Sequence, residues 1–376
     1  MASFYLDNIR LHGKKSSVTV EDGTITALGA GNEKGLPRVD GEGRQLLPGF
    51  LDLHTHGAAG VDVNAADPEG LCKISRFFAT RGVTGWQCSV LTDTREQTLK
   101  AIKAAREVIE NGSGGAALLG IHLEGPCLSV EYKGAMPESL LMKEAGIDLF
   151  REYQAAAGGH ITYLTLSPEV PGAVEIVPAL RELGITVAMG HSAAGYDASR
   201  AAVKAGVTAA THLGNAERLF HQHDPAIWGV ALESDCWVEA ICDGRHLHPG
   251  TVRLYLKAKG WGKVVAITDS IMAAGLPDGN YKLGVNDVVV VDGDAKLPNG
   301  TRAGSTLTLD RALLKIMEWT GADVEKAAEL MSRNPAALMG WGSKGEIAPG
   351  KDADFVLTDD ALAIHATFVK GERVYG

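Results

Sequence analysis

Eight short apolar runs alternate with helical patterns through the middle of this chain, and this alternation constrains the fold more than any other feature. Each run has the length of a buried strand. The runs are residues 46–53, 85–91, 116–122, 161–166, 185–189, 207–212, 237–242 and 264–268, and the helical segments include 96–109, 174–183, 198–205 and 251–259. Strands that alternate with helices form parallel sheets. The chain is therefore predicted to be an α/β protein with a (β/α)8 TIM-like barrel.

A doubly wound open sheet is the alternative fold for such an alternation. Its dinucleotide-binding members carry a Gly-x-Gly-x-x-Gly turn after the first strand, and no such turn follows residues 46–53. Residues 281–297 interrupt the alternation and are predicted to form an inserted hairpin or flap.

The two ends of the chain have strand patterns without helices between them. Residues 17–28 hold two strand-like segments joined by a turn at Asp22-Gly23, and the last 30 residues have a similar pattern. Neither end has enough apolar surface to fold alone. We therefore expect residues 1–47 and 347–376 to form one small β-sandwich domain, and residues 48–346 to form the barrel.

Composition and charge exclude several classes of protein. Hydrophobic residues make up 45% of the 376 residues and charged residues 22%, which are globular values. The net charge of −10 argues against nucleic-acid or membrane partners. The N-terminus lacks the apolar core of a signal peptide, and no apolar run is long enough to span a bilayer. Five cysteines without a CxxC spacing predict reduced thiols and a cytoplasmic location.

Several of the apolar runs end on a residue that can bind a metal ion. These residues are His54 and His56, Glu124, His191, His212 and Asp269. In a parallel barrel all strand C-termini lie on one face, so these side chains are expected to converge there. Residues i and i+2 of a strand point to the same side, so His54 and His56 can face one ion. Imidazole and carboxylate ligands together suit Zn²⁺ and similar divalent ions.

Most of these residues have another explanation when they are taken alone. His54 and His56 could simply be two polar residues at a strand end. An aspartate after a strand often caps the next helix, which is an alternative for Asp269. A buried histidine is more often a hydrogen-bonded core residue than a ligand, which applies to His191 and His212. Independent strand ends rarely all carry ligand-type residues by chance, so the set together predicts a catalytic metal site with a coordination position left open for water.

A series of motifs across most of the chain identifies a family resemblance. The motifs are His54-Thr-His56-Gly, His122-Leu-Glu124-Gly-Pro126, Gly190-His191-Ser192, Thr211-His212-Leu-Gly-Asn215-Ala216, Asp243-Gly-Arg-His246-Leu-His248-Pro, Thr268-Asp269, Ala303-Gly-Ser-Thr-Leu and Gly345-Glu-Ile-Ala-Pro-Gly-Lys-Asp-Ala-Asp354. In this order they resemble the N-acetylglucosamine-6-phosphate deacetylases of the amidohydrolase superfamily. The resemblance implies a barrel that carries a small β-sandwich built from both chain ends.

The resemblance also implies roles for the residues at the strand ends. Glu124, His191 and His212 match the ligands of the main metal, and His54 and His56 match the ligands of a second ion that only some members hold. The implied cofactor is therefore one or two divalent ions, with Zn²⁺ as the default. Asp269 matches the catalytic acid/base of the family. A homodimer is expected because the family is usually dimeric.

Two departures from the family pattern fall at substrate-recognition positions. The family usually has a histidine that contacts substrate where this chain has Met136, and a methionine cannot replace that hydrogen bond. The family's phosphate-gripping arginine is replaced by His223, which lacks the bidentate guanidinium fork.

Charged residues near these positions also depart from the family pattern. Glu217 stands in place of a methionine, and it would repel a phosphate if it points inward. The alternative is that Glu217 forms a salt bridge to Arg218 or Arg245 at the pocket rim. Either arginine could restore an anion-binding site, and either could equally be a solvated surface residue.

Three further positions match substrate contacts of the family. Asn215 and Ala216 match residues that contact substrate through side chain and backbone, and His246 matches a histidine near the phosphate. Cys127 occupies a position that is usually aromatic, and it is interpreted as a packing residue.

The sequence therefore predicts a metal-dependent deacetylase that acts on the N-acetyl amide of an amino sugar. By resemblance, the substrate is N-acetylglucosamine 6-phosphate and the products are glucosamine 6-phosphate and acetate. The first alternative is a different N-acyl substrate: N-acetylgalactosamine 6-phosphate, an unphosphorylated N-acetyl sugar or an N-acyl amino acid. The second alternative is a non-catalytic binding relative.

Overall fold

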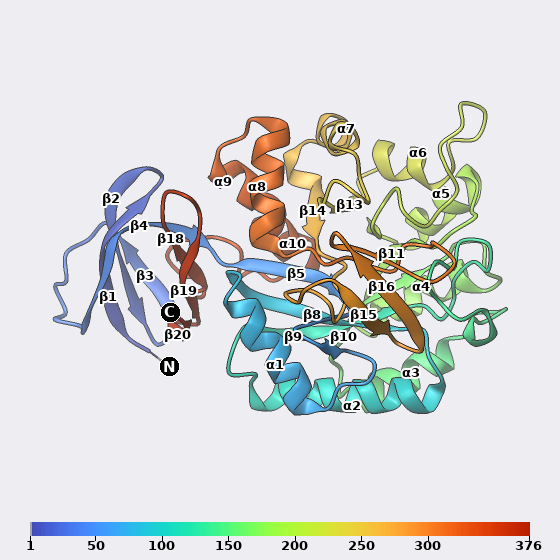
Figure 1. Ribbon diagram of the computed structural model, residues 1–376, viewed down its shortest axis with the longest axis horizontal. Helices are drawn as coiled ribbons and strands as arrows, with labels where there is room; N and C mark the ends of the chain where they lie inside the picture. The colour runs from blue at the N-terminus through green and yellow to red at the C-terminus, as the bar shows by residue number, and fades with distance from the viewer. Residues whose placement is uncertain (1) are drawn as a thin grey trace.

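A computed structural model describes residues 2–376 and contains an eight-stranded parallel barrel, which lies to the right of a smaller sheet in Figure 1. The strand order is β14-β13-β12-β11-β10-β9-β8-β5. The bounds are β5 (Phe50–Thr55), β8 (Val83–Leu91), β9 (Ala117–Glu124), β10 (Ile161–Leu166), β11 (Thr186–Met189), β12 (Ala209–Ala210), β13 (Trp237–Ile241) and β14 (Val264–Ile267). The first and last strands are joined where the Asp269 N–H donates to the His54 carbonyl over 2.8 Å. The predicted TIM-like barrel is confirmed.

Helices cover the outside of the barrel (Figure 1). They are α1 (Pro68–Ala79), α2 (Arg95–Asn111), α3 (Ile147–Ala156), α4 (Ala173–Glu182), α5 (Tyr196–Ala205), α6 (Ala226–Glu233), α7 (Pro249–Lys259), α8 (Leu309–Thr320), α9 (Val324–Ala328) and α10 (Arg333–Met339), with 3-10 turns at Glu138–Leu140, Trp261–Lys263 and Glu329–Met331. They bury an apolar stripe against strands that are themselves almost wholly buried, as parallel strands covered on both faces must be. No helix within residues 2–376 combines the length and the apolar character that a membrane crossing needs.

Both chain ends build a separate seven-stranded sheet beside the barrel (Figure 1). Its strands are β1 (Phe4–Leu11), β2 (Lys14–Glu21), β3 (Thr24–Leu28), β4 (Arg38–Pro48), β18 (Phe355–Thr358), β19 (Ile364–Val369) and β20 (Glu372–Tyr375). Strand β4 pairs with β1 on one side and with β18 on the other, which joins the two ends. This sheet has its own apolar core, to which Leu6, Val20 and Phe355 belong. The predicted domain boundaries, 1–47 with 347–376 and 48–346, stay a prediction.

The first apolar run, residues 46–53, is not one strand. It contains the end of β4 and the start of β5, which are separated at Gly49. A side chain at Gly49 would meet Thr84 at 2.2 Å, so the chain passes here only without a Cβ. The run therefore belongs half to the small sheet and half to the barrel.

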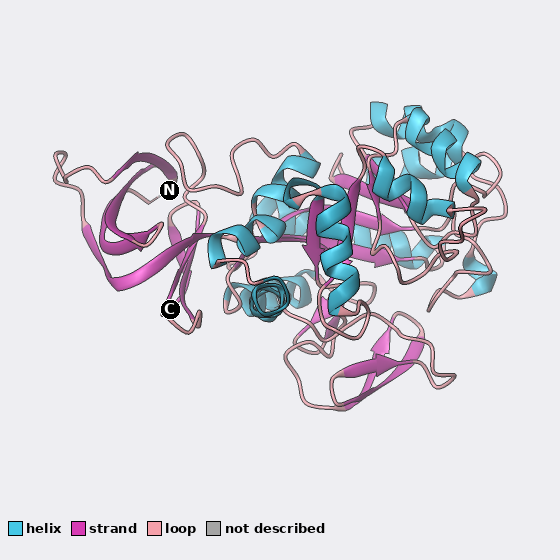
Figure 2. Ribbon diagram, turned by 90° about the horizontal axis from the view of Figure 1, so that it is seen from above, coloured by secondary structure: helices cyan, strands magenta, loops and turns pink. Residues whose placement is uncertain are grey.

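The predicted flap is a three-stranded antiparallel sheet of β15 (Gly279–Leu283), β16 (Asn286–Val291) and β17 (Asp294–Lys296). Figure 2 shows it standing out from the barrel. Its inner face packs Leu283, Val288 and Val290 against residues that include Met136 and Ile271. A short pair, β6 (Gly57–Ala58) and β7 (Val61–Asp62), follows β5.

A buried ion-pair cluster lies between the last helix and the small sheet, and it gives a stability prediction. The Lys344 ammonium is 2.6 Å from Asp354 and 2.9 Å from Asp352, and the side chains of Lys344 and Asp354 are 9% and 4% exposed. Lys344→Ala leaves the Asp354 carboxylate buried without its cation, so we expect a loss of about 3 kcal/mol in the free energy of unfolding. The measurement is urea denaturation.

The matched control for this prediction is Lys34→Ala, which breaks an exposed pair with Glu21. An exposed pair contributes less than about 1 kcal/mol, so the control should stay within that range. Burial opposes the charge on Lys344, but Asp354 raises its pKa above the usual value. The stabilisation is therefore present at neutral pH and is lost only as pH rises through that raised pKa. Equal effects of the two substitutions would contradict the prediction.

Candidate active site

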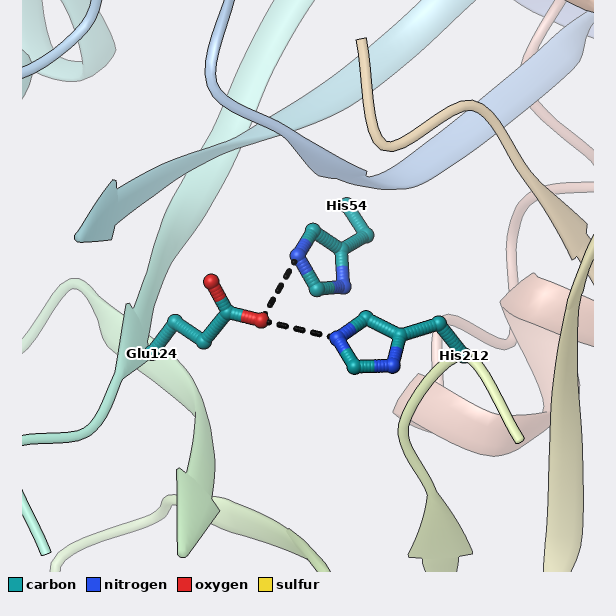
Figure 3. A group of neighbouring side chains, drawn as sticks. All are labelled: His54, Glu124 and His212. Atoms are coloured by element: carbon teal, nitrogen blue, oxygen red, sulfur yellow. Dashed lines mark hydrogen bonds and ion pairs between the residues drawn. The ribbon is translucent and has the colours of Figure 1, made fainter. Parts of the chain in front are cut away.

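Five potential metal ligands converge at the C-terminal end of the barrel strands. His54 lies at the end of β5 with His56 just after it, Glu124 ends β9, and His191 and His212 follow β11 and β12. Figure 3 shows the rings of His54 and His212 both directed at one oxygen of the Glu124 carboxylate. All five residues are buried. The cluster thus gathers residues from distant parts of the chain, since His54 and His212 are 158 positions apart.

The donor atoms of this cluster are close enough to share an ion. Glu124 Oε1 lies 3.1 Å from His191 Nε2 and from His212 Nε2, and those two nitrogens lie 3.1 Å from each other. His54 Nε2 is 3.3 Å from the same oxygen. Zinc–nitrogen bonds of about 2.0–2.1 Å at tetrahedral angles put ligand atoms about 3.3 Å apart. The chemistry and spacing of these donors therefore fit a divalent ion.

A second group of donors overlaps the first. His54, His56 and Asp269 offer atoms that all lie within 4.8 Å of one another, as do His54, Glu124 and His212. His54 Nε2 is 3.1 Å from His56 Nε2, and His56 Nε2 is 3.3 Å from Glu124 Oε2. Glu124 therefore presents one oxygen toward His54, His191 and His212 and the other toward His56.

The outer nitrogens of two of these histidines have hydrogen-bond partners that fix the rings. His56 Nδ1 is 2.9 Å from the Ser89 carbonyl, and His191 Nδ1 is 2.8 Å from the Tyr132 carbonyl. Because a carbonyl only accepts, both Nδ1 atoms donate outward, and both rings turn their Nε2 atoms toward the centre. Partners of this kind orient metal-binding histidines. The motif histidine His122 is different, because its two ring nitrogens are 2.8 Å from Ser89 Oγ and 2.9 Å from Thr165 Oγ1.

Three of the site residues have left-handed backbone conformations. The φ angles are +49° at His191, +30° at His212 and +50° at Asp269. Non-glycine residues rarely adopt this region, and such residues gather at active sites, where the surrounding structure holds them in place. Each lies immediately beyond a barrel strand, where the turn directs its side chain into the barrel mouth.

The carboxylates and imidazoles of the cluster shift each other's protonation. Burial opposes ionisation of Glu124, but the histidines around it, led by His54 and His191, hold its pKa well below the usual range. Burial likewise opposes a charge on His56, yet hydrogen bonds to Asp269 and Glu124 raise its pKa to about 9. The cluster therefore stabilises positive charge next to its carboxylates, which is the electrostatic requirement for holding a cation.

Asp269 completes the cluster. Its Oδ1 lies 3.2 Å from His56 Nε2 and 3.7 Å from His54 Nε2. Burial opposes its ionisation, but the hydrogen bond to His56 keeps the pKa of the carboxyl below the usual value, so Asp269 is a carboxylate at neutral pH. Behind it, a Cβ at Gly304 would meet the Asp269 carbonyl oxygen at 2.8 Å, and φ there is +61°. The glycine of the Ala303-Gly-Ser motif therefore allows this segment to pack against Asp269.

The cluster opens into a cavity of about 500 Å³. The donors that line it are His56, Glu124, His191, His212 and Asp269. This volume is within the range of small-molecule sites. The remaining wall comes from the β9 loop, the loops after β12 and β13, and the flap.

Comparison with known proteins places the chain in a family. The sequence model of the amidohydrolase family matches residues 45–374. The chain belongs to the amidohydrolase family. The N-acetylglucosamine-6-phosphate deacetylase of Lysinibacillus sphaericus is 33% identical over 95% of this chain and 93% of its own length. The N-acetylgalactosamine-6-phosphate deacetylase of Escherichia coli O157:H7 is 33% identical over 87% of each chain.

Solved structures support the same assignment. A mutant N-acetyl-D-glucosamine-6-phosphate deacetylase from Mycobacterium smegmatis, in complex with N-acetyl-D-glucosamine-6-phosphate, superposes with a TM-score of 0.91 at 29% identity and covers 100% of both chains. The predicted resemblance to the N-acetylglucosamine-6-phosphate deacetylases is confirmed, and this amidohydrolase is an enzyme that hydrolyses an amide bond. The non-catalytic alternative is not favoured.

Four of the predicted substrate-binding residues line the cavity of this amidohydrolase. They are Met136, Asn215, Ala216 and His246. The Asn215 amide donates to the His212 carbonyl over 2.8 Å, which ties it to the metal cluster. His246 Nδ1 is 2.7 Å from Asp243 Oδ2, so its other nitrogen remains to meet a ligand.

Glu217 lies beneath the cavity wall and is buried. Its carboxylate accepts from the backbone N–H groups of Gly214 and, over 3.1 Å, Ala216. Burial raises the pKa of this carboxyl, and those two hydrogen bonds partly offset the effect. Neither of the expected orientations is found among the described residues: Glu217 does not line the cavity and it has no arginine partner.

The structure does not bring the other three predicted residues to the cavity. Arg218 pairs with Asp224 at 3.0 Å, and Arg245 donates to the Asp292 carbonyl. His223 is exposed and belongs to a separate surface depression near Tyr196.

Sequence reasoning missed several residues that shape the site. Glu239 on β13 accepts from Tyr163 Oη over 2.7 Å and lies 3.4 Å from His54 Nδ1. Its signal was a lone acid inside an apolar run. Lys296 and Arg302 of the flap line the cavity, and both lie close to the Ala303-Gly-Ser motif that was singled out.

Proposed function

We propose that this enzyme hydrolyses the N-acetyl amide of a phosphorylated amino sugar, with N-acetylglucosamine 6-phosphate as the substrate and glucosamine 6-phosphate and acetate as products. The observation that carries the proposal is the convergence of Asp269 and five potential ligands at the barrel mouth, where Asp269 and four of the five ligands line one cavity, in a chain of this family. The deacetylase names of its relatives support the choice of substrate.

We propose Glu124, His191 and His212 as the main ligand set and His54 and His56 as ligands for a second ion. The donor types favour Zn²⁺. A bound divalent ion lowers the pKa of water and polarises a carbonyl oxygen. Asp269 is a carboxylate at neutral pH. It takes a proton from the attacking water while the water oxygen bonds to the carbonyl carbon of the acetyl group.

Asp269 then acts as an acid. It gives the proton to the amide nitrogen as the C–N bond breaks, so acetic acid and a free amine leave and Asp269 returns to the carboxylate form. At neutral pH the acid then passes its remaining proton to the amine, which gives acetate and an ammonium group. We propose that Asn215, Ala216, His246 and Met136 hold the sugar, because these residues line the same cavity. A substrate-binding role stays a prediction for four residues that do not line the cavity: His223, Arg218, Arg245 and Glu217.

A substrate panel tests this proposal. We expect N-acetylglucosamine 6-phosphate to be hydrolysed with the largest kcat/KM, ahead of N-acetylgalactosamine 6-phosphate, N-acetylglucosamine and N-acyl-D-amino acids. The galactosamine ester is the second candidate because one relative carries that name at 33% identity. Acetate release by the zinc-loaded protein is the measurement. Preference for an N-acyl amino acid would contradict the proposal.

The homodimer, the cytoplasmic location and the absence of nucleic-acid and membrane partners stay predictions. The five free cysteines support the location, because thiols stay reduced in the cytoplasm. Dimerisation is checked by sedimentation of the purified protein.

A further inference from the structure

Two cations form part of the cavity wall, one at the end of the flap and one just beyond it, and they are called the flap cations below. Lys296 ends β17, and Arg302 follows six residues later; both line the cavity. Among the described residues that line it, these are the only lysine and arginine. The other positive groups in the wall are the histidines of the metal cluster and His246, which is tied to Asp243. The fixed positive charge of the cavity therefore comes from the flap.

The local structure holds these two side chains together. Lys296 and Arg302 pair across an antiparallel bridge, and directly opposed residues on such a ladder point to the same face. Asp294, two residues before Lys296, is on that face too. Its carboxylate is 2.8 Å from Lys296 Nζ and 3.0 Å from Arg302 Nε.

The charges of this cluster do not cancel. Asp294 supplies one negative charge against two positive ones, so a net charge of +1 remains. Burial opposes ionisation of Asp294, but Arg302 and Lys296 lower its pKa to about 2, so it stays a carboxylate in the neutral range. The side chains of Lys296 and Arg302 are 45% and 40% exposed. Asp294 accepts from Arg302 Nε at 3.0 Å and from Nη2 at 3.3 Å, which leaves the Nη1 edge of the guanidinium for a ligand.

The flap cations are also linked to the catalytic carboxylate through a short segment. Ser305 donates its N–H to the Asp269 carbonyl over 2.7 Å and accepts from the Ile271 N–H over 3.0 Å. Arg302 is three residues before Ser305, which is at most about 10 Å of extended chain. One small molecule could therefore place an amide at Asp269 and an anionic group at the flap.

We propose that Arg302, assisted by Lys296, binds the phosphate ester of the substrate. This contact determines the preference of the enzyme for a phosphorylated sugar. This inference rests on the proposed function. A guanidinium binds phosphate oxygens through two parallel N–H groups, and a lysine adds a point charge. These residues supply the anion contact that Arg218, Arg245 and His223 do not supply, since those three lie outside the cavity.

The test compares Arg302→Ala with wild type on N-acetylglucosamine 6-phosphate and on N-acetylglucosamine. A charged hydrogen bond contributes enough for about a 10- to 100-fold change. We expect kcat/KM on the phosphorylated sugar to fall by that factor, mostly through a higher KM, and kcat/KM on the unphosphorylated sugar to stay within about twofold. Lys296→Ala should show a smaller loss of the same kind.

The matched control is Lys282→Ala, which removes a lysine of the same flap that pairs with Asp287 at 2.6 Å and does not line the cavity. It should leave both rates unchanged. The inference is overturned if Arg302→Ala keeps the wild-type ratio of kcat/KM between the phosphorylated and the unphosphorylated sugar. It is also overturned if kcat/KM falls equally on both sugars, because the cluster then has only a structural role.

A binding measurement separates this inference from the proposed function. Titration calorimetry with glucosamine 6-phosphate should show a Kd raised about 10-fold or more in Arg302→Ala. One outcome is that wild type binds glucosamine 6-phosphate through Arg302 and yet hydrolyses neither N-acetylglucosamine 6-phosphate nor N-acetylgalactosamine 6-phosphate. In that case the proposed function fails and the phosphate site at Arg302, the flap site, stands. If wild type hydrolyses the phosphorylated sugar and Arg302→Ala binds its product normally, the flap site fails alone.

Discussion

Asp269→Asn is expected to lower kcat by about 10²- to 10⁴-fold, the range for removal of a general acid/base. The amide keeps the shape of the side chain but cannot take a proton from water or return one to the leaving amine. Metal content should remain at the wild-type level, because Glu124, His191 and His212 still present donors 3.1 Å apart. Acetate release and elemental analysis of the same sample are the two measurements.

Metal content distinguishes two roles that the geometry allows for Asp269. Its carboxylate also belongs to a possible ligand group with His54 and His56. A variant that loses one ion together with turnover would make Asp269 a ligand. Normal turnover would remove it from the acid/base role altogether. The exposed Asp235 pairs with Lys263, and Asp235→Asn is the matched control for the same chemical change.

The barrel was predictable because its signal is local. The run at residues 161–166 consists of aliphatic, aromatic and β-branched residues, and the strand β10 has those bounds. The run at residues 46–53 was wrongly predicted to be one strand, because apolar character does not mark the point at which a chain leaves one sheet and enters another. That break depends on the closeness of Thr84 to Gly49, a contact across 35 residues.

The metal end of the site was predictable from one rule of topology. Parallel strands deliver the residues at their C-termini to the same face, so residue type and strand position were sufficient to gather His54, Glu124 and His212. The rule does not apply to Glu217, because Glu217 lies in a turn beyond the end of β12 and the shape of that turn sets the direction of its side chain. Gly214 has φ +100° there, and the backbone N–H groups of the turn bind the Glu217 carboxylate.

The flap cations were not predictable for a different reason. Arg302 reaches the cavity because the three-stranded sheet stands over the barrel mouth, and sequence pattern does not give the placement of an inserted sheet. The specificity end of this site is therefore built from loops and an insertion, whereas the chemical end is built from strands. Substrate preference can change on such a fold while the ligands stay the same.

Glu124→Gln is expected to abolish binding of the main ion and to lower kcat/KM by about 10³-fold or more. The oxygens of Glu124 lie within 3.3 Å of four imidazole nitrogens, those of His54, His56, His191 and His212. A neutral amide removes the negative charge that holds a cation there. Loss of an ion that is worth several kcal/mol in the transition state gives a change of this size.

The measurement for Glu124→Gln is zinc stoichiometry after dialysis, followed by kcat/KM with and without added zinc. Glu138→Gln is the control, since Glu138 is exposed in the turn Glu138–Leu140. Wild type treated with a chelator should lose activity and regain it with zinc, whereas the variant should not regain it. If Glu124→Gln retains the ion and most of its turnover, the carboxylate does not bind the ion, and the ligand set would have to be drawn from the histidines and Asp269 alone.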